Sequence, residues 1–350
     1  MNTYHLLGRT GLRVSPIGLG AMTFGQHGWG ADETTAREIF TEYLDAGGNL
    51  VDTAVSYAQG RSEEMVGKLI AETKSRDRVV LSTKFSSFTE PGNPNAIGNG
   101  RKNMLAALDT SLRRLGTDYI DLYWLHMWDT VTPVEEVMST FDALVRGGKV
   151  RAIGLSDVPA WYAAKAQMLA RAHGWEPVAA MQLEYSLAQR GIEREHVPAA
   201  QDLGIGIIPW SPLSSGFLTG KYNRVDGIPA GSGRLGVPPF DGTSAVLPPY
   251  TDQQWDLLDE LRAVAAETGH SPARIAINWV TRRPGVTSTL IGATSATQLK
   301  DNLAALDVEL SAEQSDRLEK VLRPELYQPY LMFDRDFLKR AYVQSFEVKA

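Results

Sequence analysis

The chain has 350 residues, of which 43% are hydrophobic and 22% charged, the composition of a globular protein with a large core. Its formal net charge of −6, together with the lack of any Lys/Arg-rich run, argues against non-specific binding to nucleic acid or to an anionic membrane. The cysteine count of zero excludes a disulfide framework, a cysteine nucleophile and a cysteine-ligated metal.

Two short extended runs at residues 4–7 and 12–15, around a turn bounded by Gly8 and Gly11, predict an N-terminal β-hairpin. Eight strands are then expected at residues 17–19, 49–52, 79–84, 120–126, 150–155, 179–183, 206–210 and 287–291. Helices are expected at residues 33–46, 62–70, 102–115, 133–145, 159–172, 193–203 and 296–306. The second of these should begin with a capping Ser62 followed by two glutamates, and Pro159 should lie in a first helical turn.

Strands that alternate with helices predict a parallel α/β sheet. Eight strands without a composition break favour a single (β/α)8 TIM barrel that spans residues 1–350. The alternative is a doubly wound sheet with a dinucleotide at its switch point. However, Gly18, Gly20 and Gly25 do not match the spacing G-x-G-x-x-G, and no other run does.

Two segments extend beyond this alternation. Residues 214–249 form a Gly/Pro-rich stretch, which predicts a long loop on the rim of the barrel that acts as a clamp or lid. The tail at residues 324–350 carries four aromatic residues and is expected to pack near the rim, where it would cap the site: Tyr327, Tyr330, Phe333 and Phe337.

Three successive predicted strands end on chemically active residues. Asp52, Lys84 and His126 should meet at the carboxyl ends of their strands, with Tyr57 one loop away, and in a parallel barrel this edge carries the active site. A free phenol has a pKa of about 10. A nearby lysine should lower the pKa of Tyr57, and an aspartate would hold that lysine charged. With a histidine to orient a carbonyl group, such a site suits hydride transfer and implies a nicotinamide cofactor.

The sequence resembles the aldo-keto reductases across essentially its whole length. The resemblance rests on GLGAM at 18–22, DTAVSY at 52–57 with GRSEE at 60–64, STK at 82–84, DYIDL at 118–122 with LH at 125–126, GGKVR at 147–151 with GLS at 154–156, WSPLSSGFLTGK at 210–221, and IG at 291–292 with QLKDN at 298–302. Residues 95–102, 128–129 and 156–161 resemble the aryl-alcohol dehydrogenase branch more narrowly.

The resemblance implies a catalytic tetrad with Tyr57 as general acid, Lys84 and Asp52 as the residues that tune it, and His126 as the residue that orients the carbonyl. It also implies a set of cofactor-binding residues: Gly20, Ala21, Met22, Asp52, Ser156, Asp157, Gln182, Trp210, Ser211, Pro212, Leu213, Ser215, Gly216, Leu218, Lys221, Arg234, Ile291, Gly292, Thr294, Gln298, Asp301 and Asn302.

Within this set, the resemblance assigns Ser156, Asp157 and Gln182 to the nicotinamide carboxamide and Trp210 to the face of the ring. Residues 211–221 would wrap the pyrophosphate with backbone N–H groups, with Lys221 and Arg234 supplying positive charge. Residues 292–302 would hold the adenosine end at a helix N-terminus. We expect NADPH as the cofactor, with NADH as an alternative because Gln298 stands where many NADPH-dependent relatives have a basic residue.

Phe24, Trp29 and Trp128, together with Tyr57 and His126, suggest an aromatic-lined substrate pocket. The expected reaction is the reduction of an aryl or small aliphatic aldehyde or ketone. The alternatives are the same chemistry on a sugar or on the ketone of a secondary metabolite, a regulatory barrel similar to channel-associated relatives, and a lyase that uses Lys84 as a Schiff-base nucleophile.

The remaining expectations concern surroundings and partners. The other histidines show no ligand spacing, so no metal is expected. Residues 63–64 and 112–114 are interpreted as solvated helix faces. No signal-peptide pattern and no apolar run of transmembrane length occurs, which indicates a cytoplasmic protein. Its expected partner is a small-molecule carbonyl or alcohol, and the sequence leaves the choice between monomer and homo-oligomer open.

Overall fold

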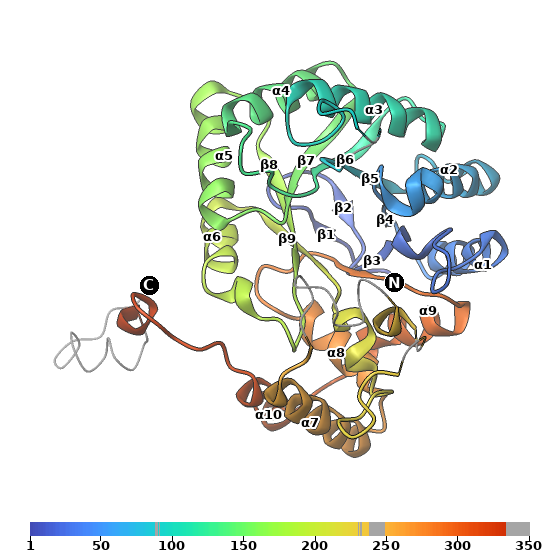
Figure 1. Ribbon diagram of the computed structural model, residues 1–350, viewed down its shortest axis with the longest axis vertical. Coiled ribbons are helices and arrows are strands. Elements are labelled where there is room, and N and C mark those ends of the chain that lie inside the picture. The colour runs from blue at the N-terminus through green and yellow to red at the C-terminus, as the bar shows by residue number, and fades with distance from the viewer. Residues whose placement is uncertain (88–89, 91, 230, 232, 238–248, 334–350) are drawn as a thin grey trace.

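An eight-stranded parallel sheet forms the centre of the molecule, with the strand order β10-β3-β4-β5-β6-β7-β8-β9 (Figure 1). The computed structural model describes residues 1–87, 90, 92–229, 231, 233–237 and 249–333. The strands are β3 (Ile17–Gly20), β4 (Leu50–Asp52), β5 (Val80–Phe85), β6 (Ile120–Leu125), β7 (Val150–Ser156), β8 (Val178–Glu184), β9 (Gly206–Trp210) and β10 (Thr289–Ile291).

The first and last strands of this order come together and close the sheet into a barrel. The Ile207 N–H group donates to the Gly285 carbonyl at 3.0 Å, and the Thr287 N–H group donates to the Ile207 carbonyl at 2.8 Å. These bonds join β9 to the segment just before β10. The predicted (β/α)8 TIM barrel is therefore confirmed.

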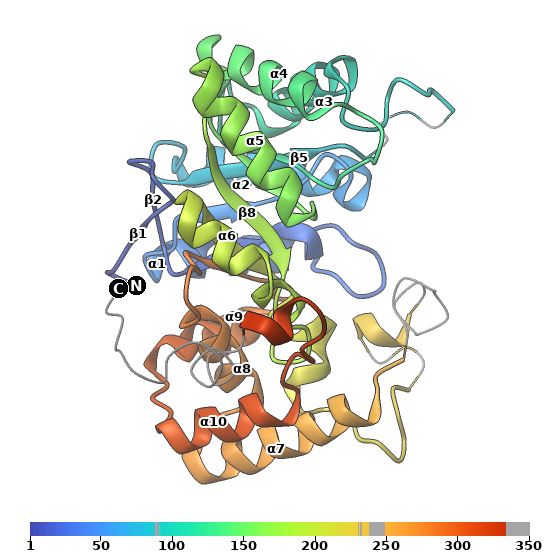
Figure 2. The same cartoon turned by 90° about the vertical axis from the view of Figure 1, so that its left-hand side faces the viewer.

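Helices surround the barrel on its outer face (Figure 1). They are α1 (Glu33–Asp45), α2 (Arg61–Thr73), α3 (Arg101–Leu115), α4 (Val134–Arg146), α5 (Ala160–His173), α6 (His196–Leu203), α7 (Asp252–Thr268), α8 (Pro272–Thr281), α9 (Ala296–Leu303) and α10 (Ala312–Val321). The last, α10, lies alongside α7 (Figure 2). The bounds of α7, α8 and α10 were not predicted from the sequence. Within the described ranges, no helix combines the length and apolar character that a membrane crossing requires.

Two predicted helix starts were wrong. Helix α2 begins at Arg61 after Gly60, whose φ of 96° turns the chain into the helix, and no side chain caps it. Ser62 is instead buried inside the helix, and its hydroxyl donates to the Ala21 carbonyl at 2.7 Å, so it ties the helix to the barrel. Helix α5 begins at Ala160, which leaves Pro159 at the N-cap, outside the first turn.

The interior of the barrel is filled by side chains and closed at one end. Apolar residues from the strands and from the N-terminal hairpin share one cluster: Leu7, Val14, Leu50, Val80, Leu122, Trp124, Ala152, Ala179, Ala180, Ile208 and Leu290. The predicted hairpin, β1 (His5–Leu6) with β2 (Arg13–Val14), is confirmed. His5 Nδ1 lies 2.8 Å from the Thr287 carbonyl, and a Cβ atom on Gly8 would lie 2.3 Å from the Ala179 carbonyl. The hairpin therefore closes the amino ends of the strands, and the site lies at the other end.

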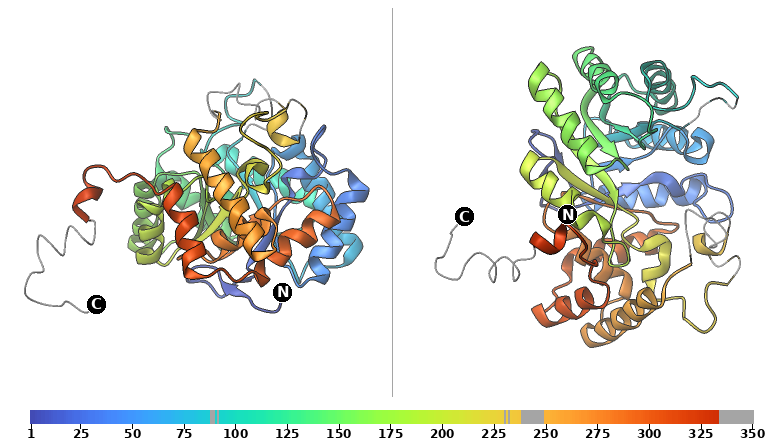
Figure 3. Two further views of the ribbon diagram at one scale, coloured as in Figure 1. Left: turned by 90° about the horizontal axis from the view of Figure 1, so that it is seen from below. Right: turned by 60° about the vertical axis from the view of Figure 1, so that its left-hand side comes forward.

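The long rim segment and the tail are described only in part. The segment contains the 3₁₀ turns Ser214–Thr219 and Arg234–Gly236, and residues 230, 232 and 238–248 lie outside the described ranges. In the tail, the Tyr330 hydroxyl donates to Glu195, just before α6. The short turn Tyr330–Phe333 lies outside the barrel, in the red part of the ribbon in Figure 3. Residues 334–350, which include Phe337, also lie outside the described ranges, so the capping of the site by the tail stays a prediction.

Candidate active site

The four predicted catalytic residues come together at the carboxyl end of the barrel. Asp52 is the last residue of β4, Lys84 lies near the end of β5, and His126 directly follows β6. Tyr57 begins a 3₁₀ turn, Tyr57–Gly60, that leads from β4 into α2. The alternating direction of strand side chains explains this arrangement. Leu122 and Trp124 lie in the cluster inside the barrel, and His126 continues the same two-residue register.

The ammonium group of Lys84 is fully buried and has three acceptors. It forms an ion pair with Asp52 and donates to the Thr53 carbonyl at 2.9 Å and to the Tyr57 phenol oxygen at 3.2 Å. Three acceptors match the three N–H groups of an ammonium, which a buried charge needs to be stable. Burial lowers the pKa of Lys84, but the charges of Asp52 and Tyr57 outweigh burial and raise it overall. Lys84 therefore stays protonated.

Asp52 is held from the opposite side as well. Its Oδ1 atom accepts hydrogen bonds from the Ser82 hydroxyl at 2.5 Å and from the Gln182 side-chain amide at 3.2 Å. Both carboxylate oxygens of Asp52 are thus hydrogen-bonded by protein groups. The carboxylate is thus fixed beside Lys84. The side-chain nitrogen of Gln182 is used for this purpose, and the side-chain oxygen Oε1 of Gln182 is left as an acceptor.

The predicted lowering of the Tyr57 pKa was wrong in its net direction. Burial raises the pKa of Tyr57 and outweighs the lowering by the Lys84 charge, so the pKa lies above its usual value of 10.0. The lysine is visible in the sequence, whereas the burial of the phenol is not. The consequence is a phenol that stays protonated at neutral pH, the form that can donate a proton to a carbonyl oxygen.

His126 is held in its neutral form. Burial and the charge of Lys84 lower its pKa to about 3. Its ring packs edge-on against Tyr57, with the ring centres 5.7 Å apart and the planes at 77°. The His126 backbone N–H group donates to the Ser86 hydroxyl at 3.1 Å. A neutral imidazole carries one N–H donor. Beside the phenol, it can hydrogen-bond the same carbonyl oxygen.

The residues expected at the nicotinamide carboxamide also lie together, at the ends of β7, β8 and β9. Trp210 donates from its indole N–H to Asp157 Oδ1 at 3.1 Å. The Asp157 backbone N–H group donates to the Gln182 backbone carbonyl at 3.2 Å. Ser156 is the last residue of β7 and is buried. Although Asp157 faces the open end of the barrel, partial burial of its carboxyl group raises its pKa to about 6.

The segment expected at the pyrophosphate makes a chain of left-handed turns. Positive φ angles occur at Ser211 (56°), Ser214 (48°), Ser215 (55°) and Gly216 (97°). Within it, the N–H groups of Ser214, Ser215, Gly216 and Leu218 already donate to Ser211 or Leu213. These four groups are therefore used inside the loop, and phosphate contacts would come from other N–H groups and from charged side chains.

Lys221 and Arg234 lie in different surroundings. A Cβ atom on Gly216 would lie 4.0 Å from Lys221 Nζ, and one on Gly233 would lie 2.8 Å from it, so this ammonium group borders the left-handed loop. Arg234 stacks over the Trp29 ring, 5.3 Å from its centre, and this contact joins the long rim segment to the loop before α1. Arg234 belongs to the turn Arg234–Gly236, which packs against the turn Ser214–Thr219, so both cations lie near the expected pyrophosphate loop.

The expected adenosine end surrounds the start of α9. Thr294 donates from its N–H group and its hydroxyl to Gln298 Oε1, both at 2.9 Å. Asp301 forms an ion pair with Arg274 of α8 at 2.7 Å. Arg274 could not be predicted from the sequence, because only the packing of α8 against α9 brings this cation to residues that lie 27 positions further along the chain. Asn302 donates from its side-chain amide to the Gly292 carbonyl at 3.3 Å.

The expected substrate residues differ in their accessibility. Trp128 is half-buried beside His126 and packs edge-on against Trp161, with the ring centres 5.4 Å apart. Trp161, which sequence analysis did not assign to the pocket, is 56% exposed. Trp29 is half-buried under Arg234. Phe24 is fully buried and belongs to the core between sheet and helices, so it supports the wall without facing open space.

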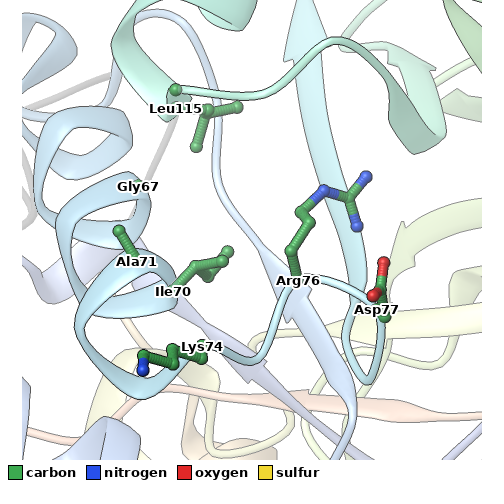
Figure 4. Close-up of a pocket in the computed structure, with 8 residues that line it drawn as sticks. Gly67, Ile70, Ala71, Lys74, Arg76, Asp77 and Leu115 are labelled. Atoms are coloured by element: carbon green, nitrogen blue, oxygen red, sulfur yellow. The ribbon is translucent and has the colours of Figure 1, made fainter.

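A second hollow, of about 200 Å³, lies between α2 and α3 and is separate from this site (Figure 4). Its polar lining residues, Lys74, Arg76 and Asp77, precede β5 and so lie at the amino ends of the strands. Arg76 is engaged there by Asp121 at 2.8 Å. Among the described residues, no group of three or more His, Asp or Glu side chains is arranged to hold a metal ion.

A barrel with an Asp–Tyr–Lys–His group at its carboxyl end, beside a row of polar residues suited to a dinucleotide, defines a class of NAD(P)H-dependent oxidoreductases. The model of the aldo/keto reductase family matches residues 16–323, and the chain belongs to this family. It is 34% identical to an aryl-alcohol dehydrogenase from Phanerodontia chrysosporium whose name specifies NADP(+), over 92% of this chain and 86% of that protein.

Two further relatives show the range of the family around this chain. A norsolorinic acid reductase of Aspergillus flavus is 33% identical over 89% of this chain and 79% of its own length. A putative voltage-gated potassium channel subunit beta of Schizosaccharomyces pombe is 33% identical over 91% of this chain and 93% of its own length. The aryl-alcohol dehydrogenases among the relatives support the aryl-alcohol dehydrogenase-type branch, and the chain is an oxidoreductase that reduces carbonyl groups with a nicotinamide cofactor.

Proposed function

We propose that this protein reduces aryl or small aliphatic aldehydes and ketones to alcohols with NADPH, and that Tyr57 is the general acid. The observation that supports the proposal most is the buried contact of the Lys84 ammonium with both Asp52 and the Tyr57 phenol. It combines a protonated phenol with a fixed positive charge that can stabilise the phenolate once the proton has left.

The reaction uses the tetrad as follows. The carbonyl oxygen of the substrate accepts hydrogen bonds from the Tyr57 hydroxyl and from neutral His126. The nicotinamide cofactor, when bound, supplies the hydride to the carbonyl carbon. Tyr57 then gives its proton to the oxygen, and Lys84 stabilises the phenolate that forms, while Asp52 keeps the ammonium in place. Oxidation of the alcohol runs the same steps in reverse, with the phenolate as base.

The residues at the rim fit a nicotinamide group. A carboxamide NH2 group donates two hydrogen bonds. The site offers two acceptors for it, the Asp157 carboxylate and the side-chain oxygen of Gln182, whose side-chain nitrogen binds Asp52. The Trp210 indole is fixed by its bond to Asp157 at the end of β9. These groups would hold the carboxamide and border the ring.

NADPH is proposed over NADH because two cations flank the path of the dinucleotide. Lys221 borders the left-handed loop, and Arg274 lies at the adenosine end beside Asp301. A 2′-phosphate adds negative charge at the adenosine end, which a guanidinium group can bind through two hydrogen bonds. The relative from Phanerodontia chrysosporium whose name specifies NADP(+) points in the same direction.

The aryl class of substrate is supported by the aromatic wall next to His126, which Trp128 and Trp161 form. An aromatic ring can pack against such a wall with a gain beyond its buried area. The ketone of a secondary metabolite is the second candidate, and a reductase named for norsolorinic acid is 33% identical over 89% of this chain. The intact tetrad argues against a non-catalytic regulatory barrel.

The proposal is tested by titrating the tryptophan fluorescence with NADPH and with NADH, followed by a substrate screen. Benzaldehyde should be reduced faster at low concentration than cyclohexanecarbaldehyde, which has a saturated ring of similar size, and butanal and an open-chain sugar aldehyde complete the set. Saturable quenching with turnover supports the proposal. Binding of neither cofactor contradicts it and brings forward a Schiff base on Lys84, which borohydride trapping would reveal.

A further inference from the structure

Arg114 of α3 contacts the turn that carries Tyr57 on both sides of that residue. Its Nη1 atom donates to the Val55 carbonyl at 2.9 Å, two residues before Tyr57. A Cβ atom on Gly60, three residues after Tyr57, would lie only 2.2 Å from the guanidinium carbon of Arg114. The planar group thus packs directly on the backbone of Gly60. The sequence interpretation of 112–114 as a solvated helix face was therefore wrong for Arg114.

The turn that Arg114 contacts has an unfavourable backbone conformation. Directly after Tyr57, three residues in a row have positive φ angles: Ala58 (48°), Gln59 (57°) and Gly60 (96°). Side chains of L-residues disfavour this region, and such conformations persist only where neighbouring structure enforces them. Because no side chain caps α2, the start of the helix does not supply that restraint. Backbone hydrogen bonds hold part of the turn, and Arg114 of α3 adds a contact on each side of Tyr57.

Glu63 completes the restraint and extends it to the strand of Lys84. Its carboxylate is fully buried, accepts a hydrogen bond from the Thr83 hydroxyl at 2.7 Å, and forms an ion pair with Arg114 at 3.2 Å. Thr83 directly precedes Lys84. The interpretation of Glu63 as a solvated residue was wrong, because this side of α2 packs on β5. A buried carboxylate needs its cation, so the pair acts as a unit.

We propose that the Glu63–Arg114 pair positions the Tyr57 phenol against the Lys84 ammonium, and that Arg114 is a positioning residue for proton transfer. The pair connects the three pieces of backbone that set this contact: β5 beside Lys84, the chain before Tyr57 and the chain after it. The Lys84–Tyr57 hydrogen bond is 3.2 Å long, so a small displacement of the turn breaks it. The catalytic part of this inference rests on the proposed function.

Arg114→Met is the direct test. A misplacement of about 1 Å in a catalytic group lowers the rate by ~10²-fold, and we expect a loss of that order in kcat. The affinity for NADPH, measured by fluorescence, should stay the same, because Arg114 acts on the turn and not on the cofactor residues. Arg113→Met is the matched control. The Arg113 guanidinium is exposed and donates to the Thr110 hydroxyl, so kcat should not change.

Two further variants keep the test valid if Arg114→Met does not fold. Glu63→Gln combined with Arg114→Met removes the buried carboxylate together with its cation and avoids an unpaired charge. Gly60→Ala disturbs the same contact from the other side, because its Cβ atom displaces the guanidinium group. Both should lower kcat with little change in NADPH affinity. Arg114→Lys keeps one hydrogen bond but not the flat packing, and should recover part of the rate.

The pH profile of alcohol oxidation separates positioning from a general structural role. Lys84 lowers the pKa of Tyr57 against the effect of burial, so a turn that moves away from Lys84 should shift the profile to higher pH. A loss of kcat with the wild-type profile, or an unchanged kcat, would overturn the inference. Hydrogen exchange of the amides at 54–60 should be faster in the variant and needs no turnover. If the wild type is inactive but the variant still shows faster exchange than the wild type, only the proposed function is refuted. If the exchange of the variant equals that of the wild type, the positioning is refuted.

Discussion

The Lys84 ammonium donates to the Tyr57 phenol oxygen over 3.2 Å while it is paired with Asp52, and this contact joins β5 to the turn after β4. It makes the chemistry of the phenol depend on two opposing effects. Burial keeps the proton on Tyr57, and Lys84 stabilises the anion that remains after the proton leaves. The same group is therefore suited to donate a proton in reduction and to accept one in oxidation.

Tyr57→Phe should remove the proton donor and leave the cofactor site intact. We expect kcat for benzaldehyde reduction to fall by at least ~10²–10⁴-fold, the contribution of general acid catalysis. The fluorescence titration with NADPH should match that of the wild type. Tyr4→Phe, at an exposed tyrosine near the closed end of the barrel, is the control and should retain full activity. Near-full turnover in Tyr57→Phe would show that another group donates the proton.

His126 should remain neutral throughout the physiological range. Burial and the Lys84 charge lower its pKa to about 3, whereas an unperturbed histidine titrates near 6.5. In an NMR titration of protein with labelled histidine, the His126 signal, assigned by its loss in His126→Gln, should not shift between pH 5 and 8. A midpoint near 6.5 for His126 would mean that its ring is more hydrated than the structure shows.

Asp157→Asn should stabilise the protein at neutral pH. The pKa of Asp157 is raised from 3.8 to about 6, so the folded state binds its proton more tightly than the unfolded state. The stability that this proton provides is full below about pH 4 and is lost as the pH rises through 6. A fully buried group with this shift would account for about 3 kcal/mol. Because Asp157 is exposed to solvent, we expect about 1 kcal/mol.

Urea unfolding without cofactor measures this effect at pH 4 and at pH 7. The free energy of unfolding of Asp157→Asn should exceed that of the wild type at pH 7 and equal it at pH 4. Asparagine retains an oxygen that can accept the Trp210 hydrogen bond, so the comparison changes mainly the charge. A wild type that is more stable than the variant at pH 7 would contradict the raised pKa.

Arg274→Met and Lys221→Met should separate the two charged parts of NADPH. If Arg274 meets the 2′-phosphate, its loss weakens NADPH by about tenfold, the loss of one charge-assisted contact, and leaves NADH nearly unaffected. Loss of Lys221, beside the left-handed loop, should weaken both cofactors equally. Arg282→Met, at the far end of α8, is the control. Equal weakening of both cofactors by Arg274→Met would place Arg274 outside the 2′-phosphate site.

The positions of Asp52, Lys84 and His126 could be predicted because each ends a buried strand, and strand alternation fixes both the barrel and the end at which they meet. The functions of Ser62, Glu63 and Arg114 could not. Their contacts join residues up to 59 positions apart, and an arginine on a helix looks the same in sequence whether it faces water or a buried carboxylate. The direction of the Tyr57 pKa was missed for a related reason, because burial depends on tertiary packing.

The hairpin at the start of the chain has a consequence for the kinetics of the enzyme. Since Leu7 and Val14 fill the amino end of the barrel in the described part of the chain, ligands reach the site from the carboxyl end. Cofactor, substrate and alcohol all pass through this end in both directions. If the dinucleotide binds along the β7–β9 side, as proposed, it lines part of the path that the smaller molecule uses. Because all ligands use the same entrance to the active site, the release of one ligand affects the binding of the next.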